Sequence, residues 1–246
     1  MKKTLILIPS RMAATRLPGK PLLKINNLSV ISHVFKRAEE AKIGEVVVAT
    51  EDQEILKDVL ENGGKAILTS REHKTGTDRI FEAYKKLGIK NVDYVLNLQG
   101  DEPDINKDDI INLNNFMINH EAELGTLAGK IQDSIMMNNK NVVKVIVENK
   151  LEKNNFPKAL NFTRENLSLI NKNIYHHIGI YSYKTSVLEK FVTLEQTNNE
   201  KKNKLEQLRA LDNNLKINVA LAKSSPIGVD TEEDYMDIKK IMEYKI

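Results

Sequence analysis

The stretch EVVVATEDQEILKDVLENGGKAILT, residues 45–69, carries the pattern that decides the fold class. Its first and last segments, residues 45–49 and 66–69, are short apolar runs of the kind that form buried strands. Between them, apolar side chains recur at helical spacing: Ile55, Leu56, Val59 and Leu60. The glycine pair 63–64 ends this periodicity. The stretch therefore predicts a strand, a helix and a second strand.

Comparable apolar runs recur along the chain and alternate with segments of helical periodicity. We expect strands at residues 5–8, 45–49, 66–69, 94–98, 142–147, 177–183 and 217–222. Most of these runs lack a polar alternation, so their strands should be buried on both faces, as in a sheet covered by helices. The sequence therefore predicts an α/β fold.

Helix starts are predicted from capping residues. Thr50, followed by Gln53, has capping-box spacing ahead of an apolar helical stripe. Other residues stand where an N-cap is expected: Thr77, Asn106 and Thr231.

Length and composition favour a single domain. A chain of 246 residues with 41% hydrophobic side chains can bury about 70 to 75% of its unfolded surface. We expect one domain, residues 1–246, with a doubly wound first half, 1–120. The second half, 121–246, is more β-rich and returns to the first through a final helix.

Charge and cysteine content exclude several classes of protein. The 37 Lys and Arg residues and 34 Asp and Glu residues leave a net charge of +3 without a dense basic run, so we expect no nucleic-acid partner. The absence of cysteine excludes a disulfide framework, a thiolate metal site and a cysteine nucleophile. The apolar run at residues 4–9 is too short to cross a bilayer, and we expect no membrane partner. GxSxG and HExxH motifs are also absent.

The segment after the first expected strand is unusually basic. IPSRMAATRLPGKPL, residues 8–22, carries Arg11, Arg16 and Lys20 and no acidic residue. Guanidinium groups and an ammonium on such a loop can surround a polyphosphate; the alternative is a solvated basic loop. The run matches neither a Walker A motif nor the GxGxxG fingerprint of dinucleotide-binding proteins.

Carboxylates follow two other apolar runs. LNLQGDEP, residues 96–103, contains Asp101 and Glu102. PIGVDTEEDY, residues 226–235, contains Asp230. Ligands of open α/β sheets bind beyond the carboxyl ends of strands, and such carboxylates with substrate phosphates suit Mg²⁺. We expect Asp101 to be the better metal ligand and Asp230 to approach it; the alternatives are a capped turn and a helix N-cap.

Two further segments have both a structural and a functional interpretation. HKTGTDRI, residues 73–80, suggests a tight turn with Arg79 on the following helix, and either a structural turn or a substrate contact is compatible with it. LEQLRAL, residues 205–211, reads as an amphipathic helix. In that interpretation its polar side chains lie in solvent: Glu206, Gln207 and Arg209.

The segment YHHIGIYSY, residues 175–183, contains adjacent histidines. On a strand, His177 and Tyr181 share one face, whereas His176 points to the other. The two histidines are therefore not expected to bind one metal ion, and a structural role for His177 is the alternative to substrate binding.

Eight segments of the chain occur in the same order and at the same spacing in one family. They are IPSRMAATRLPGKPL, VVVATEDQEI, HKTGTDRI, LNLQGDEP, NVVKVIVEN, HHIGIYSY, LEQLRAL and IGVDTEED. On these motifs the chain resembles the 3-deoxy-manno-octulosonate (Kdo) cytidylyltransferases, or CMP-Kdo synthetases, over almost its full length. The resemblance implies a three-layer nucleotide-diphosphosugar-transferase-like fold with a mixed, mostly parallel central sheet, and a homodimer formed through the second half.

The resemblance also implies a reaction. The family transfers CMP from CTP to the anomeric 2-hydroxyl of Kdo and releases pyrophosphate, with Mg²⁺ as the cofactor. This reaction belongs to the cytoplasmic supply route to lipopolysaccharide. The implied small-molecule substrates are thus CTP and Kdo.

Carried over position by position, the resemblance assigns roles to residues of this chain. The implied nucleotide-binding residues are Pro9, Ser10, Arg11, Arg16, Lys20, Thr75, Arg79 and Gln99. The implied sugar-binding residues are Gln99, Arg164, His177, Tyr181, Glu206 and Gln207. Asp101 and Asp230 match the Mg²⁺ ligands, and with Lys20 they form the implied catalytic set.

The chain departs from the family pattern on the sugar side. His176 stands where an arginine usually precedes the strand histidine, and Asn161 stands where an aromatic residue is common. These departures leave open a cytidylyltransferase for a related 2-keto acid sugar, 8-amino-Kdo or a sialic acid, although the RMAATRLPGKP run counts against a sialate enzyme. A non-catalytic nucleotide-binding protein is the alternative from another class.

Overall fold

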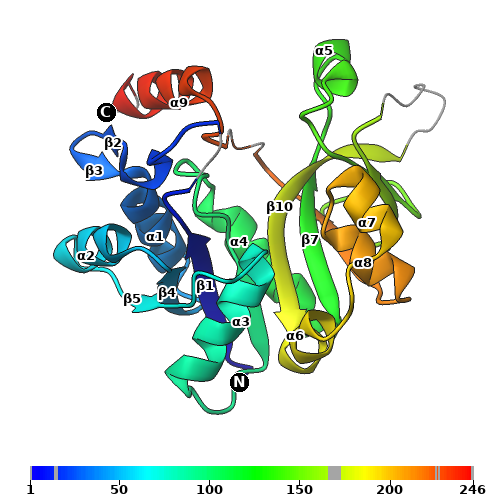
Figure 1. The fold of residues 1–246 in the computed structure, drawn as a ribbon. Coiled ribbons are helices and arrows are strands. Elements are labelled where there is room, and N and C mark those ends of the chain that lie inside the picture. The colour runs from blue at the N-terminus through cyan, green and yellow to red at the C-terminus, as the bar shows by residue number, and fades with distance from the viewer. Residues whose placement is uncertain (1, 14–15, 166–172, 225, 227, 245–246) are drawn as a thin grey trace. The chain divides into compact units, whose positions relative to one another are not determined.

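The structure is a computed structural model that describes residues 2–13, 16–165, 173–224, 226 and 228–244. The chain, traced in Figure 1, forms two compact units. The first unit comprises Met1–Ile110 and Pro226–Ile246, and the second comprises Ile111–Ser225. The C-terminal segment therefore belongs to the same unit as the N-terminal strand.

The first unit is built on a parallel sheet. Its strands are β1 (Thr4–Ser10), β4 (Gly44–Thr50), β5 (Ala66–Leu68) and β6 (Tyr94–Asn97). They lie in the order β6-β1-β4-β5, and all three pairs are parallel. Leu5, Ile6, Leu7 and Ile8 are fully buried at its centre. The strands predicted in this part of the sequence are confirmed, with ends that differ by one or two residues.

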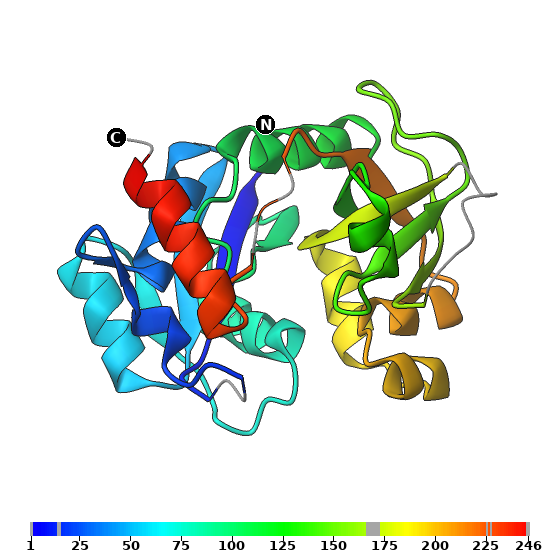
Figure 2. The same ribbon diagram turned by 90° about the horizontal axis from the view of Figure 1, so that it is seen from above.

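Helices cover both faces of this sheet. They are α1 (Val30–Glu40), α2 (Gln53–Glu61) and α3 (Gly76–Leu87). The connections through α1 and α2 run in one direction across the sheet, whereas the connection through α3 runs back. Because such crossovers are right-handed, α1 and α2 lie on one face and α3 on the other, as Figures 1 and 2 show. The winding reverses at β1, and ligands of open α/β sheets bind at such a reversal.

The C-terminal helix α9 (Glu232–Tyr244) packs on the segment that follows β1. This segment contains the short 3₁₀ helix η1 (Lys20–Leu22) and the hairpin strands β2 (Lys24–Ile25) and β3 (Leu28–Ser29). One buried cluster joins them: Ile25, Val30, Val229, Ile238 and Met242. Because Val229 belongs to this cluster, the packing fixes the position of its neighbour Asp230.

Two predicted helix starts are wrong. Thr50 is the last residue of β4, and Asp52 is the N-cap of α2. Thr75 rather than Thr77 caps α3, because its hydroxyl accepts a hydrogen bond from the backbone N–H of Asp78. The other two N-caps are confirmed by bonds from nearby backbone N–H groups to their side chains: Asn106 and Thr231.

The second unit is built on a mixed sheet. Its strands are β7 (Leu124–Gly129), β8 (Lys144–Val147), β9 (Ala159–Thr163), β10 (Ile174–Lys184) and β11 (Ile217–Leu221). They lie in the order β11-β7-β10-β8-β9, where the β11–β7 pair is parallel and the others are antiparallel. Its short helices are α5 (Ser134–Asn138), α6 (Thr185–Val192), α7 (Asn198–Asn203) and α8 (Gln207–Asp212). Helix α4 (Lys107–Asn119) leads into this unit from the first.

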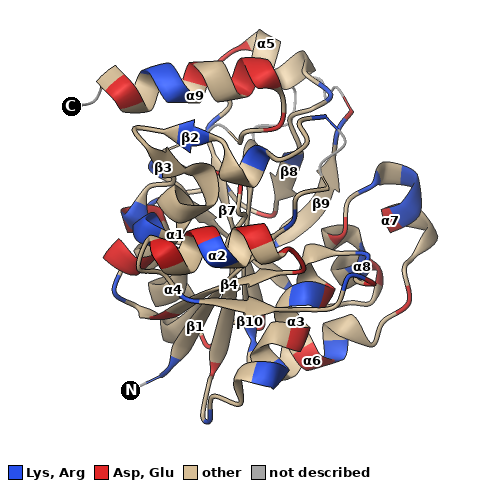
Figure 3. Ribbon diagram, turned by 60° about the vertical axis from the view of Figure 1, so that its left-hand side comes forward, with Lys and Arg blue, Asp and Glu red and all other residues tan. Residues whose placement is uncertain are grey.

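Charges of both signs lie side by side on several helices. Figure 3 shows Lys and Arg interspersed with Asp and Glu along α2, α7 and α9. Among the described residues, no helix combines the length and the apolar character that a membrane span requires.

Candidate functional site

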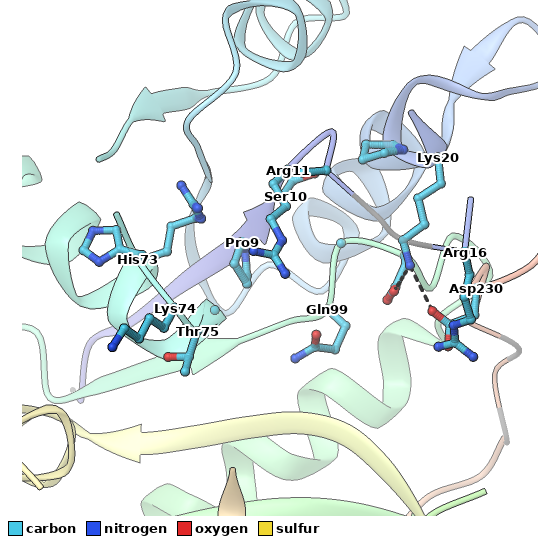
Figure 4. A pocket seen from close by; sticks show the side chains of 16 residues that line it. Pro9, Ser10, Arg11, Arg16, Lys20, His73, Lys74, Thr75, Gln99 and Asp230 are labelled. Atoms are coloured by element: carbon cyan, nitrogen blue, oxygen red, sulfur yellow. Dashed lines mark hydrogen bonds and ion pairs between the residues drawn. The ribbon is translucent and has the colours of Figure 1, made fainter. Parts of the chain in front are cut away.

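A cavity of about 330 Å³ lies in the first unit, beyond the carboxyl ends of β1 and β6. Three stretches of chain line it, within residues 9–21, 73–79 and 99–101, and Asp230 joins them from the C-terminal segment (Figure 4). The cavity wall includes all of the predicted nucleotide-binding residues: Pro9, Ser10, Arg11, Arg16, Lys20, Thr75, Arg79 and Gln99. The fold therefore gathers residues from distant motifs into one concave site.

Lys20 links the two predicted metal ligands. Its Nζ lies 2.5 Å from Oδ2 of Asp101 and 3.1 Å from Oδ1 of Asp230. The lysine side chain is only 14% exposed. Burial lowers the pKa of Lys20, but the charges of Asp101 and then Asp230 outweigh it and raise the pKa above its ordinary value. The ammonium is therefore charged and neutralises the carboxylates around it.

Backbone contacts shape the basic loop. The N–H of Met12 donates to Oδ2 of Asp52 at 2.7 Å, and the N–H of Gly19 donates to the carbonyl of Met12 at 3.1 Å. Gly19 has φ +74°, in the left-handed region that glycine adopts without strain. The loop places the guanidinium of Arg16 2.8 Å from Oδ2 of Asp230. Arg16 and Lys20 thus contact opposite oxygens of one carboxylate.

Backbone hydrogen bonds also bring Asp230 to Asp101. The N–H of Val229 donates to the carbonyl of Asp101 at 2.8 Å. The N–H groups of Asp230 and Thr231 donate to Oδ2 of Asp234 at 3.2 and 2.8 Å, which fixes the turn into α9. Asp230 therefore stands just before a helix and also faces the cavity.

Glu102 is a further, half-buried acid beside this pair. Its Oε2 is buried and has no hydrogen-bond partner among the described residues. Burial, followed by the charges of Asp101 and Asp230, raises the pKa of Glu102 to about 8. From the sequence, Asp101 is the better metal candidate of the acid pair. The only sequence signal for burial of the Glu102 side chain is its place directly after an apolar strand.

Asp101 and Asp230 fit a divalent metal ion that arrives with a polyphosphate. Their oxygens converge on one ammonium, and carboxylate oxygens are the hard donors that Mg²⁺ prefers. In the described parts of the chain, no three His, Cys, Asp or Glu side chains are grouped to hold a metal by themselves. Mg²⁺ commonly takes one or two carboxylates and completes its shell with water and substrate phosphates.

Arg79 lines the cavity, but its guanidinium is already hydrogen-bonded to other groups of the protein. The side chain is 3% exposed, donates to Oγ1 of Thr69 at 2.7 Å and to the carbonyl of Ser70 at 3.2 Å, and pairs with Glu51. Thr75 is used as the N-cap of α3. The geometry of this segment therefore favours a structural role for Arg79 that orders one wall of the cavity.

Two of the predicted sugar-binding residues lie together on β10, in the second unit. The rings of His177 and Tyr181 have centroids 5.4 Å apart. Burial, with smaller effects of His176 and Arg164, lowers the pKa of His177 to about 3. Thr126 Oγ1 donates to the carbonyl of Ile180 at 2.7 Å and lies 3.0 Å from His177 Nε2. With the Thr126 hydroxyl proton directed to that carbonyl, the neutral imidazole carries its proton on Nε2 and keeps Nδ1 as an acceptor.

The segment that contains Glu206 and Gln207 is anchored by a buried ion pair. Arg209 donates to both oxygens of Glu200, at 2.8 and 2.6 Å, and the two side chains are only 3% and 5% exposed. The guanidinium of Arg209 also lies 4.8 Å from the ring centroid of Phe191. The solvent-facing interpretation of this helix is wrong for Gln207 and Arg209, which are buried.

Arg164 contacts main-chain carbonyl groups. Its Nη1 donates to the carbonyls of Asn141, at 3.0 Å, and Lys140, at 3.4 Å. Lys144, a fully buried lysine that the sequence does not single out, donates to the carbonyl of Asn139 at 2.7 Å. Both cations thus hold the segment 139–141, and Arg164 lies in the second unit with the other sugar-binding candidates except Gln99.

Comparison with known proteins gives a consistent result. A family model described as cytidylyltransferase matches residues 5–217. The 3-deoxy-manno-octulosonate cytidylyltransferase of Afipia carboxidovorans is 44% identical over 97% of this chain and 96% of its own length. A solved structure of CMP:2-keto-3-deoxy-manno-octonic acid synthetase complexed with CTP is similar over 100% of both chains, with a TM-score of 0.90 and 33% identity.

A more distant solved structure is similar in fold alone. UDP-glucose pyrophosphorylase complexed with UDP-glucose has a TM-score of 0.74 over 100% of both chains, at 13% identity. With the synthetase structure, it confirms the predicted α/β fold of the nucleotide-sugar transferase type.

Proposed function

Because this chain belongs to the 3-deoxy-manno-octulosonate cytidylyltransferase family, we propose that CTP binds and reacts in the cavity of its first unit. The reaction transfers CMP from CTP to the anomeric 2-hydroxyl of Kdo and releases pyrophosphate. Its product, CMP-Kdo, is the activated sugar for lipopolysaccharide synthesis. The observation that carries the assignment to this cavity is the convergence of Lys20, Asp101 and Asp230 from three distant segments.

The basic loop binds the triphosphate in this proposal. Arg11 and Arg16 offer guanidinium groups that can hold phosphate oxygens in pairs, and Lys20 offers a point charge. Lys20 neutralises negative charge as it develops on the transferred and leaving phosphates. The protein thereby favours the transition state by electrostatics and needs no covalent intermediate.

Asp101 and Asp230 would hold Mg²⁺ together with the phosphates. When bound, the ion neutralises phosphate charge and makes the sugar hydroxyl easier to ionise. The contribution of the side chains is positioning, because the sugar oxygen, the α-phosphorus and the leaving oxygen must lie in line.

The sugar is bound by residues of the second unit in the same proposal. The neutral imidazole of His177 offers an acceptor at Nδ1 to a sugar hydroxyl, and Tyr181 stands beside it. Glu206 and Gln207 add polar groups from the segment that Arg209 anchors. Arg164 is the cationic partner proposed for the sugar carboxylate.

Product analysis with several acceptors tests this function. Purified protein is incubated with CTP, Mg²⁺ and Kdo, 8-amino-Kdo or a sialic acid, and the products are identified by mass spectrometry. CMP-Kdo as the main product is expected. If a product forms only with another acceptor, the assignment of nucleotidyl transfer stands and the assigned sugar changes. CTP binding without any product would favour the non-catalytic alternative.

We further propose that the protein acts in the cytoplasm as a homodimer formed through its second half. Sedimentation velocity of the purified protein should give the mass of two chains, and a single-chain mass at micromolar concentration would contradict the dimer. Fractionation of the source cells should place the activity with the cytoplasmic fraction, and activity in the membrane fraction would contradict the location.

A further inference from the structure

The protein's own cations occupy the carboxylate pair of the proposed active site. Lys20 contacts both Asp101 and Asp230, and Arg16 contacts Asp230 at 2.8 Å. We propose that Lys20 and Arg16 form a cation lock: their ion pairs with Asp101 and Asp230 prevent a free divalent metal ion from binding until the phosphates of a nucleoside triphosphate bind both cations. The inference rests on the proposed function, because it assigns the same residues to CTP and Mg²⁺.

The ammonium and a metal ion compete for the same oxygen atoms. Mg²⁺ requires oxygen ligands at about 2.0 to 2.1 Å. The Nζ of Lys20 already lies 2.5 Å from the Asp101 oxygen and 3.1 Å from the Asp230 oxygen, between the two groups (Figure 4). A metal ion bound to both oxygens would contact an ammonium of like charge. Lys20 must therefore leave before the metal can coordinate both carboxylates.

The charges of the closed lock cancel. Two carboxylates, of Asp101 and Asp230, face two cations, Lys20 and Arg16. A free metal ion thus meets a neutralised pair and gains little attraction.

A triphosphate offers both cations new partners in the same place. Arg16 and Lys20 line the cavity with Arg11, so bound phosphates can reach them. Once they turn to phosphate, Asp101 and Asp230 lose their counter-ions. The site then becomes strongly attractive to a divalent cation. Metal and nucleotide binding are consequently coupled, and linkage requires each to strengthen the other.

Mn²⁺ binding to the nucleotide-free protein tests the lock. Electron paramagnetic resonance of free Mn²⁺ gives the affinity of the wild type, of Lys20→Met and of a control, Lys74→Met. Lys74 is an exposed lysine of the same cavity, so its replacement removes one charge without uncovering a carboxylate. We expect Lys20→Met to bind Mn²⁺ at least about tenfold more tightly than wild type, a gain of at least about 1.4 kcal/mol, with the control unchanged.

The double variant Lys20→Met, Asp101→Asn locates the gain. It should lose the added Mn²⁺ affinity, because one of the two uncovered ligands is gone. Equal Mn²⁺ affinity of wild type and Lys20→Met, or a matching gain in Lys74→Met, would overturn the lock. Circular dichroism checks that each variant is folded.

If Lys20→Met does not fold, a measurement on the wild type alone tests the lock. Water-proton relaxation distinguishes protein-bound Mn²⁺ from Mn²⁺ bound to CTP in solution. Protein-bound Mn²⁺ is expected with CTP and not without it, and equal binding in both conditions would contradict the lock. Turnover with Kdo is measured in parallel. If the wild type turns over but also binds Mn²⁺ without CTP, the lock is contradicted and the proposed function is retained.

Discussion

The ammonium of Lys20 lies 2.5 Å from the carboxylate of Asp101, although 81 positions separate the two residues in the sequence. The pairing of β1 with β6 explains this contact. The two strands are adjacent and parallel, so the segments that follow them leave the sheet at the same edge. The basic motif after β1 and the acidic motif after β6 therefore belong to one site.

Replacement of either proposed metal ligand should remove activity without unfolding the protein. Asp101→Asn and Asp230→Asn each lose a charge that the metal and phosphates require, and we expect kcat to fall on the order of 10²-fold or more. Pyrophosphate release gives the rate, and thermal unfolding checks the fold. A near wild-type rate in either variant would remove that residue from the metal site.

Lys20→Ala should impair the use of CTP much more than it impairs stability. Its carboxylate partners are 28% and 46% exposed, so loss of the ion pairs should cost at most about 1 kcal/mol of unfolding free energy. We expect kcat/KM for CTP to fall on the order of 10²-fold. Full activity in this variant would support the alternative of a solvated basic loop.

The buried pair of Glu200 and Arg209 should be a major stabilising contact of the second unit. Glu200→Ala removes the two short hydrogen bonds that the buried guanidinium of Arg209 makes to a carboxylate and leaves only the longer contact with Glu206, at 3.7 Å, which costs about 3 to 5 kcal/mol. The exposed pair of Lys57 and Glu61 is a matched control, since both of its side chains are more than half exposed. Glu61→Ala should cost no more than about 0.5 kcal/mol. Urea unfolding measures both, and equal losses would contradict the assignment.

The stability of the protein should fall in mildly acidic solution because His177 is buried and neutral. Its pKa is about 3 in the folded state and 6.5 ordinarily, so the unfolded chain binds the extra proton between these values. The contribution is complete above pH 6.5 and is lost as the pH falls toward 3, by up to about 1.4 kcal/mol per pH unit.

Two histidine variants isolate this effect. His177→Gln should flatten the dependence of unfolding free energy on pH between 7 and 4, whereas a change at the exposed His120, His120→Gln, should leave the slope unchanged. The slope is the relevant readout, because loss of the Thr126 contact will itself lower stability. An unaltered slope in His177→Gln would mean that His177 binds its proton in the folded protein over the same pH range as in the unfolded chain.

Much of the first unit could be predicted from the sequence because its signals are local. Continuous apolar runs predicted β1 and β4, and the apolar stripe at helical spacing predicted α2. Residues after these strands could be proposed as a site, since parallel strands present their carboxyl ends at one edge. The roles of the site residues stay predictions until the variants are measured.

Other features depend on contacts that sequence patterns do not encode. Thr75 and Thr77 flank the same glycine, and only the backbone path decides that Thr75 caps α3. Arg209 reads as a surface residue, yet a partner on a different short helix, Glu200, permits its burial. Strand β9 lacks a continuous apolar run and is defined by its pairing with β8.

Pyrophosphate release by the purified protein with Kdo and Mg²⁺, with CTP compared against UTP, ATP and GTP, tests the proposed function most directly. We expect release that prefers CTP, requires Kdo and stops when EDTA removes the metal. No release from any nucleotide by folded protein, or release that is independent of Kdo or metal, would contradict it.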